Sequence, residues 1–421
     1  MARRAVIAGI IATGLGVLVS PGLGQATIQF CRDVRPGPTC VAVRATVEWR
    51  GQGNLPPSHV SAQLPGPTPA AVYEPPATIS SDGSADVTAA LNAWLANVPN
   101  GATVRFRPGA VYRIDREITL TDRRGLTFEG DVTFRAGPEP ADLTAHQRRT
   151  LSVFRLQGGG GYTFRGIRII GRHPAGGTAE AAYDATREAQ HGFWLAGVQG
   201  ITIEGTIISD VYGDFVYVGP DLRSGVVWSR NVTIRGGEMT RNGRQGIAMV
   251  AVDGMTVEGV RLYNLRRAVF NMEPTTSSWG ARNVRIIGNR TGAARLLWFS
   301  SAGQGWNVSD VVISRNVMET ATGVPFVYMV APRGGYRGPL VVEHNTMISG
   351  GSPAPGMRFD RVRVIVRNNL VTFPPRRLMT AVGLTDAEAT VQGDRFCGAA
   401  RAVGADPLSR VTESDNVLVC P

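Results

Sequence analysis

The sequence predicts a parallel β-helix, a solenoid whose coils each contribute short strands that stack on the strands of the next coil. A pattern of one turn residue, apolar–any–apolar–any, and then Gly or a polar residue recurs along the chain. Its copies begin at Gly125, Gly161, Gly200, Asn231, Gly254, Asn283, Asp310, Pro339 and Arg363. Neighbouring copies start between 23 (Asn231 to Gly254) and 39 (Gly161 to Gly200) residues apart, a spacing typical of solenoid repeats. The alternation indicates strands with one buried face, and the lack of helical stretches between copies excludes βαβ units.

The last four copies share an Asn directly after the pattern: Asn289, Asn316, Asn345 and Asn369. We expect each Asn to adopt the left-handed backbone of a tight turn. We also expect the stacked side chains to hydrogen-bond along the axis. Four unrelated turn asparagines are the alternative.

The composition favours an anionic partner. The chain has 421 residues, enough for one large solenoid or two ordinary domains, and its 52 glycines suit a fold with many turns. The formal net charge is +11, carried by Arg without any Lys, a bias that a GC-rich genome would also produce. A basic surface favours uronate glycans or cell-wall polymers, and nucleic acid is not expected because no recognised motif for it is visible.

Residues 1–26 have the features of a signal peptide. Arg3 and Arg4 precede an apolar run from Ala5 to Ser20, and Gly24-Gln25-Ala26 offers small residues at a cleavage site. We therefore expect a secreted or cell-surface protein with no other membrane segment. An uncleaved anchor is the alternative.

Four cysteines in an exported chain predict two disulfides. Three pairings are possible, and short loops favour Cys31–Cys40 and Cys397–Cys420. Free thiols are the alternative, and the spacing of the cysteines argues against a zinc site.

Residues 27–77 are expected to form a disulfide hairpin and a Pro-rich linker. A helix is expected over Asp86–Val98, where Ser84 or Asp86 can cap its start. Its apolar face consists of Val87, Leu91, Trp94, Leu95 and Val98. Such a helix would cover the open edge of the first coil, which could otherwise pair with other strands.

A resemblance becomes specific in this region. It lies in Asp82-Gly83, Asp86-Val-Thr88, Leu91, the segment Gly101-Ala-Thr-Val-Arg-Phe-Arg-Pro-Gly109 and Tyr112. These residues resemble the opening segment of the pectate-lyase-like right-handed β-helix superfamily. The resemblance implies an all-β, single-stranded right-handed parallel β-helix of about ten coils over residues 78–400, followed by a C-terminal cap or tail over 401–421. The same opening segment precedes lyases, hydrolases, epimerases and phage tailspikes, so it implies a fold and not an activity.

Two insertions interrupt the coils, Gly137–Arg149 and Arg172–Gln190. Long loops on a rigid scaffold often carry function. They could border a groove, and the alternative is that they are decorative surface loops.

A second strand is expected in each coil, before the patterned one. Placing Phe193, Val216, Ile247 and Phe270 inside directs one row of side chains outward: Trp194, Tyr217, Ala248, Asn271, Trp298 and Tyr328. Because coils lie about 4.8 Å apart, this row predicts a column of aromatic side chains on which sugar rings can stack. The expected substrate-binding residues are Trp194, Tyr217, Gln245, Asn271, Trp298 and Tyr328. With a register shifted by one residue, the column would be core instead.

Ionisable side chains gather at the ends of these strands. The catalytic candidates are Asp210, Asp214, Arg244, His191 and Glu273. Two carboxylates across a groove can hydrolyse a glycosidic bond. A carboxylate with an Arg can instead support β-elimination, because the Arg neutralises a uronate while the base removes its C5 proton. A turn-capping role is the alternative for Asp214.

The comparison with β-helix enzyme families is mixed. Tyr212-Gly-Asp214, followed by Arg244-Gln-Gly-Ile-Ala248, is similar in placement to the Gly-Asp-Asp and Gly-His-Gly coils of polygalacturonases. Phe215 stands where that family has its second Asp, and Arg244-Gln245 stands where it has its His. The Asp-Pro-His-Glu motif of alginate epimerases is absent as well. Asp210 and Asp214 match the calcium ligands of pectate lyases only in part, so no metal or other cofactor is expected, with Ca²⁺ left open.

These observations predict an exported protein that binds a polysaccharide, preferably an acidic one, and cleaves it as a lyase or glycosidase. A non-catalytic adhesin or structural β-helix that binds a cell-wall or host glycan is the alternative.

Overall fold

The chain divides into two compact units, residues 1–69 and 70–421. The computed structural model describes three strands within residues 15–45 and then residues 71–300, 307–320, 325–332, 338–350, 356–374 and 379–420. Side chains are described outside 15–45, 293–300 and residue 320.

The first unit contains an antiparallel sheet of β1 (Leu15–Gly22), β2 (Gln25–Val34) and β3 (Gly37–Ala45). Cys31 lies opposite Cys40 in the register of β2 and β3. The side chains of this pair and most of the expected signal peptide lie outside the described part of the chain, so the Cys31–Cys40 bond and the signal peptide stay predictions.

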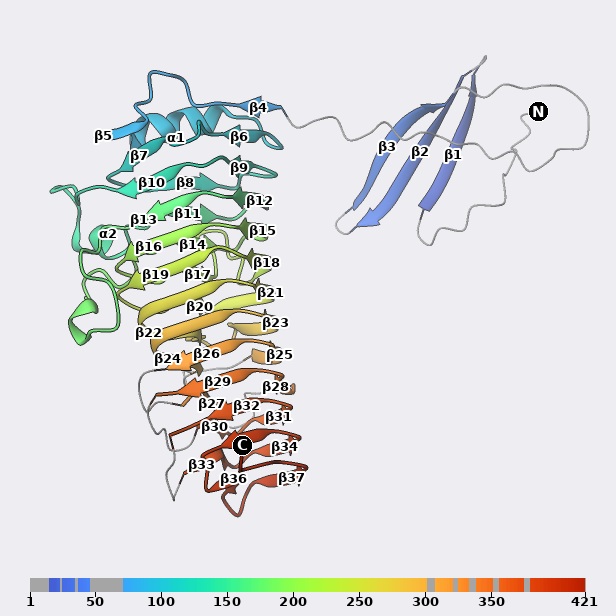
Figure 1. Ribbon diagram of the computed structural model, residues 1–421. Coiled ribbons are helices and arrows are strands. Elements are labelled where there is room, and N and C mark those ends of the chain that lie inside the picture. Colours follow the sequence, from blue (N-terminus) through green and yellow to red (C-terminus); the bar gives the residue numbers. More distant parts are fainter. Residues whose placement is uncertain are drawn as a thin grey trace, which may run out of the picture. The chain divides into compact units, whose positions relative to one another are not determined.

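The second unit is a parallel β-helix with three faces (Figure 1). The first face carries the repeated pattern and has 13 strands: β4 (Val72–Tyr73), β6 (Thr103–Arg105), β9 (Thr127–Glu129), β12 (Gly160–Arg165), β15 (Gln199–Glu204), β18 (Ser229–Arg235), β21 (Ala251–Glu258), β23 (Gly280–Ile287), β25 (Asn307–Ser314), β28 (Leu340–Glu343), β31 (Arg363–Arg367), β34 (Glu388–Gln392) and β37 (Arg410–Ser414).

The second face follows the first after a short turn. Its strands are β5 (Asp82–Asp86), β7 (Val111–Ile114), β10 (Thr133–Ala136), β13 (Arg168–Ile170), β16 (Ile207–Val211), β19 (Glu238–Asn242), β26 (Val317–Thr320), β29 (Thr346–Ser349), β32 (Leu370–Thr372) and β35 (Arg395–Cys397).

The third face consists of β8 (Ile118–Thr121), β11 (Phe154–Gln157), β14 (Phe193–Ala196), β17 (Val216–Gly219), β20 (Ile247–Met249), β27 (Val327–Val330), β30 (Met357–Asp360), β33 (Thr380–Thr385) and β36 (Arg401–Ala405). Two longer strands, β22 (Arg261–Met272) and β24 (Arg290–Ser300), run through the corner and belong to both the second and third faces.

The predicted β-helix is confirmed, and it is longer and has one more strand per coil than the pattern predicts. The pattern predicts two strands, but a third, such as β16, follows the patterned strand after a short turn at Gly205. The coils also extend past the expected ends at 78 and 400, because β4 pairs with β6, and β36 and β37 pair with β33 and β34.

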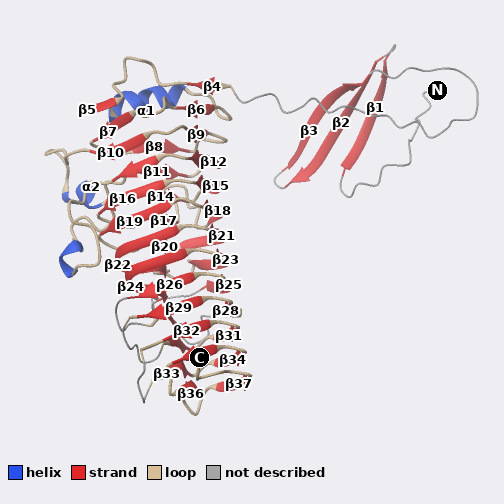
Figure 2. Ribbon diagram, in the orientation of Figure 1, coloured by secondary structure: helices blue, strands red, loops and turns tan. Residues whose placement is uncertain are grey.

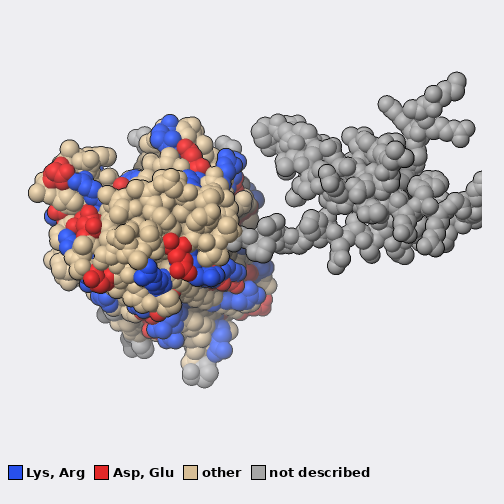
Figure 3. Space-filling view, turned by 90° about the horizontal axis from the view of Figure 1, so that it is seen from above, with Lys and Arg blue, Asp and Glu red and all other residues tan. Residues whose placement is uncertain are grey.

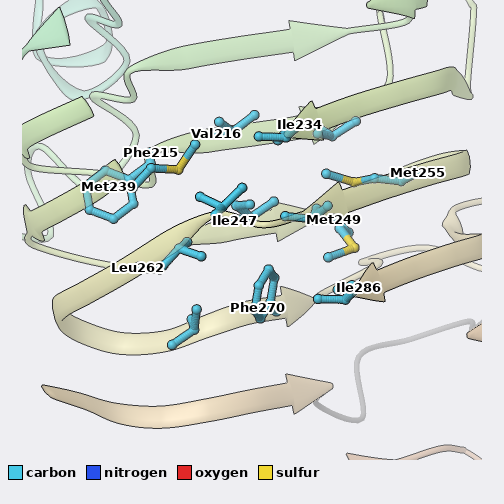
Figure 4. Close-up of a cluster of buried hydrophobic side chains, with 14 of the residues drawn as sticks. Phe215, Val216, Ile234, Met239, Ile247, Met249, Met255, Leu262, Phe270 and Ile286 are labelled. Carbon is cyan, nitrogen blue, oxygen red and sulfur yellow. The ribbon is translucent and has the colours of Figure 1, made fainter. Parts of the chain in front are cut away.

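Side chains from all three faces fill the interior (Figure 4). Ile234, Met239 and Ile247 come from the first, second and third faces, and each is at most 1% exposed. The inward placement of Phe193, Val216, Ile247 and Phe270 is confirmed, since all four are buried. Truncating one such side chain to Ala typically costs about 2–5 kcal/mol of stability, so this core fixes the positions of the residues that face outward.

A ladder of asparagines joins the coils at the corner between the first and second faces. The side-chain oxygens of Asn316, Asn345 and Asn369 each accept the backbone and side-chain N–H groups of the Asn one coil before, at 2.9–3.0 Å. The predicted axial hydrogen bonding is thus confirmed. The predicted left-handed backbone at these positions is wrong.

The residue before each ladder Asn has the positive φ instead: Gly288, Arg315, His344 and Asn368. That residue makes the turn, while the Asn itself is buried. The division of roles has a physical reason, because the Asn side chain must point inward to reach the Asn of the neighbouring coils.

Helix α1 (Thr88–Asn97) buries Leu91 and Leu95 against the first coils, as expected for a cap. It is shorter than the expected 86–98, and its N-cap residue is Val87. The carboxylate of Asp86 accepts the N–H of Thr88 at 3.0 Å. Helix α2 (Ala145–Arg149) lies in the first insertion, and a 3₁₀ turn (Glu180–Ala182) lies in the second (Figure 2). None of the helices in the described residues is long and apolar enough to cross a membrane.

Charges of opposite sign alternate along the outer side of the first face. Arg105, Glu129, Arg165, Glu204 and Arg235 lie in register on successive strands. Neighbours in this row form ion pairs of 2.9–3.5 Å. Viewed from above, basic and acidic side chains are also interspersed around the edge of the unit (Figure 3). Each Arg of this row therefore has an acidic neighbour.

Candidate functional site

Polar side chains at the corner between the second and third faces form a ladder of mixed composition. Each accepts the backbone N–H of a residue one coil further along the chain. The acceptor–donor pairs are Glu117–Ser152 (2.8 Å), Ser152–His191 (3.4 Å), His191–Asp214 (2.9 Å), Asp214–Gln245 (2.9 Å) and Gln245–Ala268 (2.9 Å). His191, Asp214 and Gln245 lie in consecutive coils, and their hydrogen bonds link the turns of this corner.

Asp214 is fully buried in this ladder. Its oxygens accept the backbone N–H of Gln245 and the Nη1 of Arg244, the latter at 3.0 and 2.8 Å. Burial raises the pKa of Asp214 to about 7, opposed by the charge of Arg244 and reinforced by that of Glu273. Asp214 therefore holds Arg244 from below the surface.

His191 is neutral. Burial, followed by the charges of Arg244 and Arg155, lowers the pKa of His191 well below its usual value. Its Nδ1 accepts the N–H of Asp214, so the neutral ring carries its proton on Nε2. The 3.5 Å approach of this Nδ1 to the carboxylate of Asp214 is for that reason not an ion pair.

Arg244 bridges two carboxylates that differ in exposure. Its Nη1 binds the buried Asp214, and its Nη2 donates to Glu273 Oε1 at 2.7 Å. The second oxygen of Glu273 accepts the side-chain N–H of Asn271. The side chain of Glu273 is 25% exposed, whereas that of Asp214 is 0% exposed. The bridge therefore presents the carboxylate of Glu273 to the surface, while the Arg244 side chain is 16% exposed and its Nε is buried.

Two aromatic side chains lie beside this bridge on the third face. Trp194 and Tyr217 occupy one row on adjacent strands, are partly buried, and have ring centroids 5.1 Å apart. Tyr217 also stacks on His191 at 5.2 Å. The guanidinium of Arg155 lies 4.1 Å from the centre of the Trp194 ring and is itself paired with Glu117 at 2.8 Å. Both rings are thus held in fixed positions.

The outward row is only partly the exposed column that the sequence predicts. Tyr328 is partly buried in the same row, but Ala248 and Asn271 are buried. In the backbone register, Trp298 pairs with Phe270, and Phe299 pairs with Asn271. The register thus differs by one residue from the alignment that the sequence predicts, and the side chain of Trp298 lies outside the described residues. The register of β22 against β24 shifts between Leu265 and Ala268, which defeats an alignment made by counting alternate residues.

The second insertion packs against the bridge. Glu188 Oε2 lies 3.7 Å from the Nε of Arg244 and accepts the hydroxyl of Tyr183 at 2.6 Å. The two insertions also bind each other, because Glu139 pairs with Arg187 at 2.6 Å and accepts the side-chain N–H of Gln190 at 2.8 Å. The insertions therefore border the site, which is one of the two alternatives that the sequence leaves open.

Some expected site residues are engaged elsewhere. Asp210 forms its own ion pair with Arg241 at 2.6 Å, and the side-chain oxygen of Gln245 is occupied by Ala268. Glu188, Arg155, Glu117 and Ser152 contribute to the site and were not singled out from the sequence. Arg155 could have been found from the register, since it lies one coil before Trp194 in the same row.

The described residues contain no group of three or more His, Cys, Asp or Glu side chains that could hold a metal ion. Asp210 and Asp214, the residues considered for Ca²⁺, each bind an Arg and do not fit such a site. Two cavities, of about 420 and 560 Å³, lie on other parts of the unit, and neither is lined by Asp214, Arg244 or Glu273.

Comparisons with solved structures decide the fold. The chain is similar to endo-xylogalacturonan hydrolase from Aspergillus tubingensis, with 14% identity, a TM-score of 0.55, and 83% of this chain and 93% of the other covered. It is also similar to the GH136 lacto-N-biosidase from Eubacterium ramulus, with 12% identity, a TM-score of 0.53, and 83% and 68% covered. The chain has the right-handed parallel β-helix fold. The resemblance to that superfamily is thus confirmed at the level of fold.

Sequence comparisons match a smaller part of the chain than the solved structures do. The uncharacterized protein YclG of Bacillus subtilis (strain 168) is 27% identical over 194 residues, which are 43% of this chain and 32% of YclG. The match therefore spans about a third of that relative. No family model matches the chain.

Proposed function

We propose that this protein binds an acidic polysaccharide along the third face and cleaves it by β-elimination. The observation that carries the proposal is the Arg244 bridge between the buried Asp214 and the partly exposed Glu273, beside Trp194 and Tyr217.

In this proposal each member of the bridge has a separate role. Glu273 is the base that takes the C5 proton, and Arg244 stabilises the uronate as negative charge develops on it. The electron pair forms the C4–C5 double bond while the C4–O bond breaks, and the leaving oxygen takes a proton from solvent. Asp214 is a positioning residue, because a fully buried carboxylate cannot touch a polymer.

Exposure favours elimination over hydrolysis. A glycosidase of the usual kind needs two carboxylates flanking the bond, and only one carboxylate of this bridge reaches the surface. The two similar solved structures are named as an endo-xylogalacturonan hydrolase and a lacto-N-biosidase, which supports a carbohydrate substrate without deciding the reaction. The disulfide Cys397–Cys420 favours an oxidising compartment, in keeping with proposed export to the medium or cell surface.

Glycan binding without cleavage is the second candidate, and the mixed ladder favours it. Asp214 and Gln245 have their hydrogen bonds filled by the chain itself, and neither cavity lies at the bridge. In this case the site would serve recognition, with Glu273 and Arg244 as polar contacts.

A panel of neutral and uronate polysaccharides separates these functions. We expect ultraviolet-absorbing unsaturated ends from a uronate polymer, with binding that weakens as salt screens the charges. New reducing ends without unsaturated products would show that the protein hydrolyses the polymer and does not cleave it by elimination. Binding without any product would establish the second candidate.

A further inference from the structure

The cavity of about 560 Å³ lies on the second face and is walled by arginines. Arg113 and Arg135 come from the neighbouring strands β7 and β10, where they lie in register, and Arg172 begins the second insertion. The rest of the lining is small or neutral: Gly83, Ser84, Ala136, Gly137 and Pro138.

The positive charge of this cavity is only partly balanced. Arg113 is paired with Asp115 through two hydrogen bonds of 2.8 and 2.7 Å. Among the described residues, no carboxylate lies within ion-pair distance of Arg135 or Arg172. Three guanidinium groups thus meet one directly paired carboxylate. Asp86 and Glu117 act on them from further off, as does Glu139, which is already paired with Arg148 and Arg187.

Arg172 is held in place by the backbone. It donates to the carbonyl oxygens of Gly137, Leu151, Ile114 and Asp115 at 3.0–3.4 Å. Burial lowers the pKa of Arg172 from its ordinary value, and the charges of Glu139, Asp115 and Glu117 oppose this effect. Its guanidinium is therefore a positive charge in a fixed position, and few of its N–H groups remain available to bind a ligand.

Arg135 differs because its donors are largely free. It is exposed, and its Nη2 donates one hydrogen bond to the carbonyl of Gly83 at 2.8 Å. Gly83 and Gly137 let the charged side chains approach the backbone closely, since a Cβ at Gly83 would meet Val111 at 2.8 Å and Arg135 at 2.9 Å, and one at Gly137 would meet the carboxylate of Asp115 at 1.8 Å. A guanidinium with a free edge in a positive field suits a planar or tetrahedral oxyanion, which it can bind through two parallel hydrogen bonds.

We propose that this cavity is an anion-binding site that takes the carboxylate or sulfate group of an acidic sugar, with Arg135 as the direct contact. The site is separate from the Arg244 bridge and stands without the proposed cleavage. Strand β10, which carries Arg135, lies two coils before β16, the strand that leads to Asp214. At ordinary strand spacing this is about 10 Å along the axis.

Calorimetric titration with galacturonate, sulfate and phosphate at low ionic strength tests the site. We expect saturable binding of at least one anion, weaker at higher salt. Arg135→Gln should lower the affinity at least about 10-fold, because a charged hydrogen-bonding pair is lost, while Arg135→Lys keeps the charge and should lose less. Arg230→Gln removes the same charge from an exposed position on the first face and should bind as the wild type does.

The relative affinities for the three anions identify the chemical group that the site binds. Preference for galacturonate indicates a uronate, preference for sulfate indicates a sulfated sugar, and equal binding indicates any oxyanion; each of these supports the site. Wild-type protein that binds none of the three overturns it. So does an Arg135→Gln variant that binds as tightly as the wild type. Cleavage of polysaccharide does not enter this test, so its outcome is independent of the proposed function.

Discussion

Asp394 continues the asparagine ladder by accepting both the backbone and side-chain N–H groups of Asn369 on one oxygen, each at 2.8 Å. Its other oxygen, Oδ2, is buried and has no hydrogen-bond partner. Asn416 follows in the ladder, because its side-chain oxygen accepts the backbone N–H of Asp394 at 3.0 Å. The side-chain amides of Asn369 and Asn416, on either side of Asp394, donate to the carbonyls of Val342 and Val391. Strand register places the carbonyl of Val366 at the equivalent point, so Oδ2 needs a proton to make the same bond. Burial accordingly raises the pKa of Asp394 to about 6.

Asp394→Asn should stabilise the protein above neutral pH, because the new amide supplies the missing N–H. The folded pKa lies above the ordinary 3.8, so the wild type is most stable when Asp394 is protonated and loses stability as the pH rises through about 6. The variant lacks this loss, and its advantage should grow from pH 5 to pH 8, reaching roughly 1–3 kcal/mol. Urea unfolding at both pH values measures it.

The reverse change provides the matched control. Asn345→Asp places a second carboxylate in the ladder and should destabilise the protein more at pH 8 than at pH 5. An Asp394→Asn variant that is no more stable than the wild type at pH 8 would contradict the interpretation of this position.

The two ladders show what the sequence can reveal. The asparagine ladder could be predicted because one residue type recurs at one register, and only the residue with positive φ was misplaced. The mixed ladder could not, because Glu117, Ser152, His191, Asp214 and Gln245 share only the ability to accept an N–H. Asp214, Arg244 and Glu273 could be grouped because they lie at the ends of neighbouring strands, but the burial of Asp214 depends on how His191, Arg244 and Gln245 of the neighbouring coils pack around it.

Cys397–Cys420 is the disulfide present in the described side chains. It closes a separation of 23 residues, and loops of this size are stabilised by roughly 3 kcal/mol. Cys420→Ser should therefore lower the melting temperature. We expect thiol labelling of denatured, unreduced exported protein to find no free cysteine, and labelling of all four would contradict both predicted disulfides.

Trp194→Ala should weaken glycan binding by roughly 1 kcal/mol, the size of a typical aromatic contact. Trp228→Ala is the matched control, because Trp228 also lies under an arginine, Arg282, at 3.9 Å but precedes a first-face strand. Binding and melting temperature are measured for both variants. Normal binding by Trp194→Ala together with a large fall in melting temperature would mean that Trp194 serves the structure and not the glycan.

Glu273→Gln should lower turnover by about 100-fold or more if Glu273 is the base. Binding and melting temperature should change little, because the substitution is nearly isosteric and the side chain is partly exposed. Glu204→Gln, in the charge row of the first face, removes a carboxylate that is also paired with Arg and should leave turnover unchanged. Full activity of Glu273→Gln on a polymer that the wild type cleaves would remove Glu273 from the mechanism.

Asp214→Asn separates positioning from turn formation. The amide oxygen can still accept the N–H of Gln245, so the ladder keeps its hydrogen bond, but Arg244 loses its buried charge partner. We expect turnover to fall with little change in KM, because Arg244 then keeps only Glu273 and the more distant Glu188 as charge partners. The titration gives an independent readout: the folded pKa of about 7 lies above the ordinary 3.8, so the wild type gains stability relative to the variant as the pH falls from 8 to 5. The gain is bounded by about 1.4 kcal/mol per pH unit. A stability difference that does not vary with pH would show that Asp214 stays ionised throughout this range, and unchanged turnover would show that it acts on the turn alone.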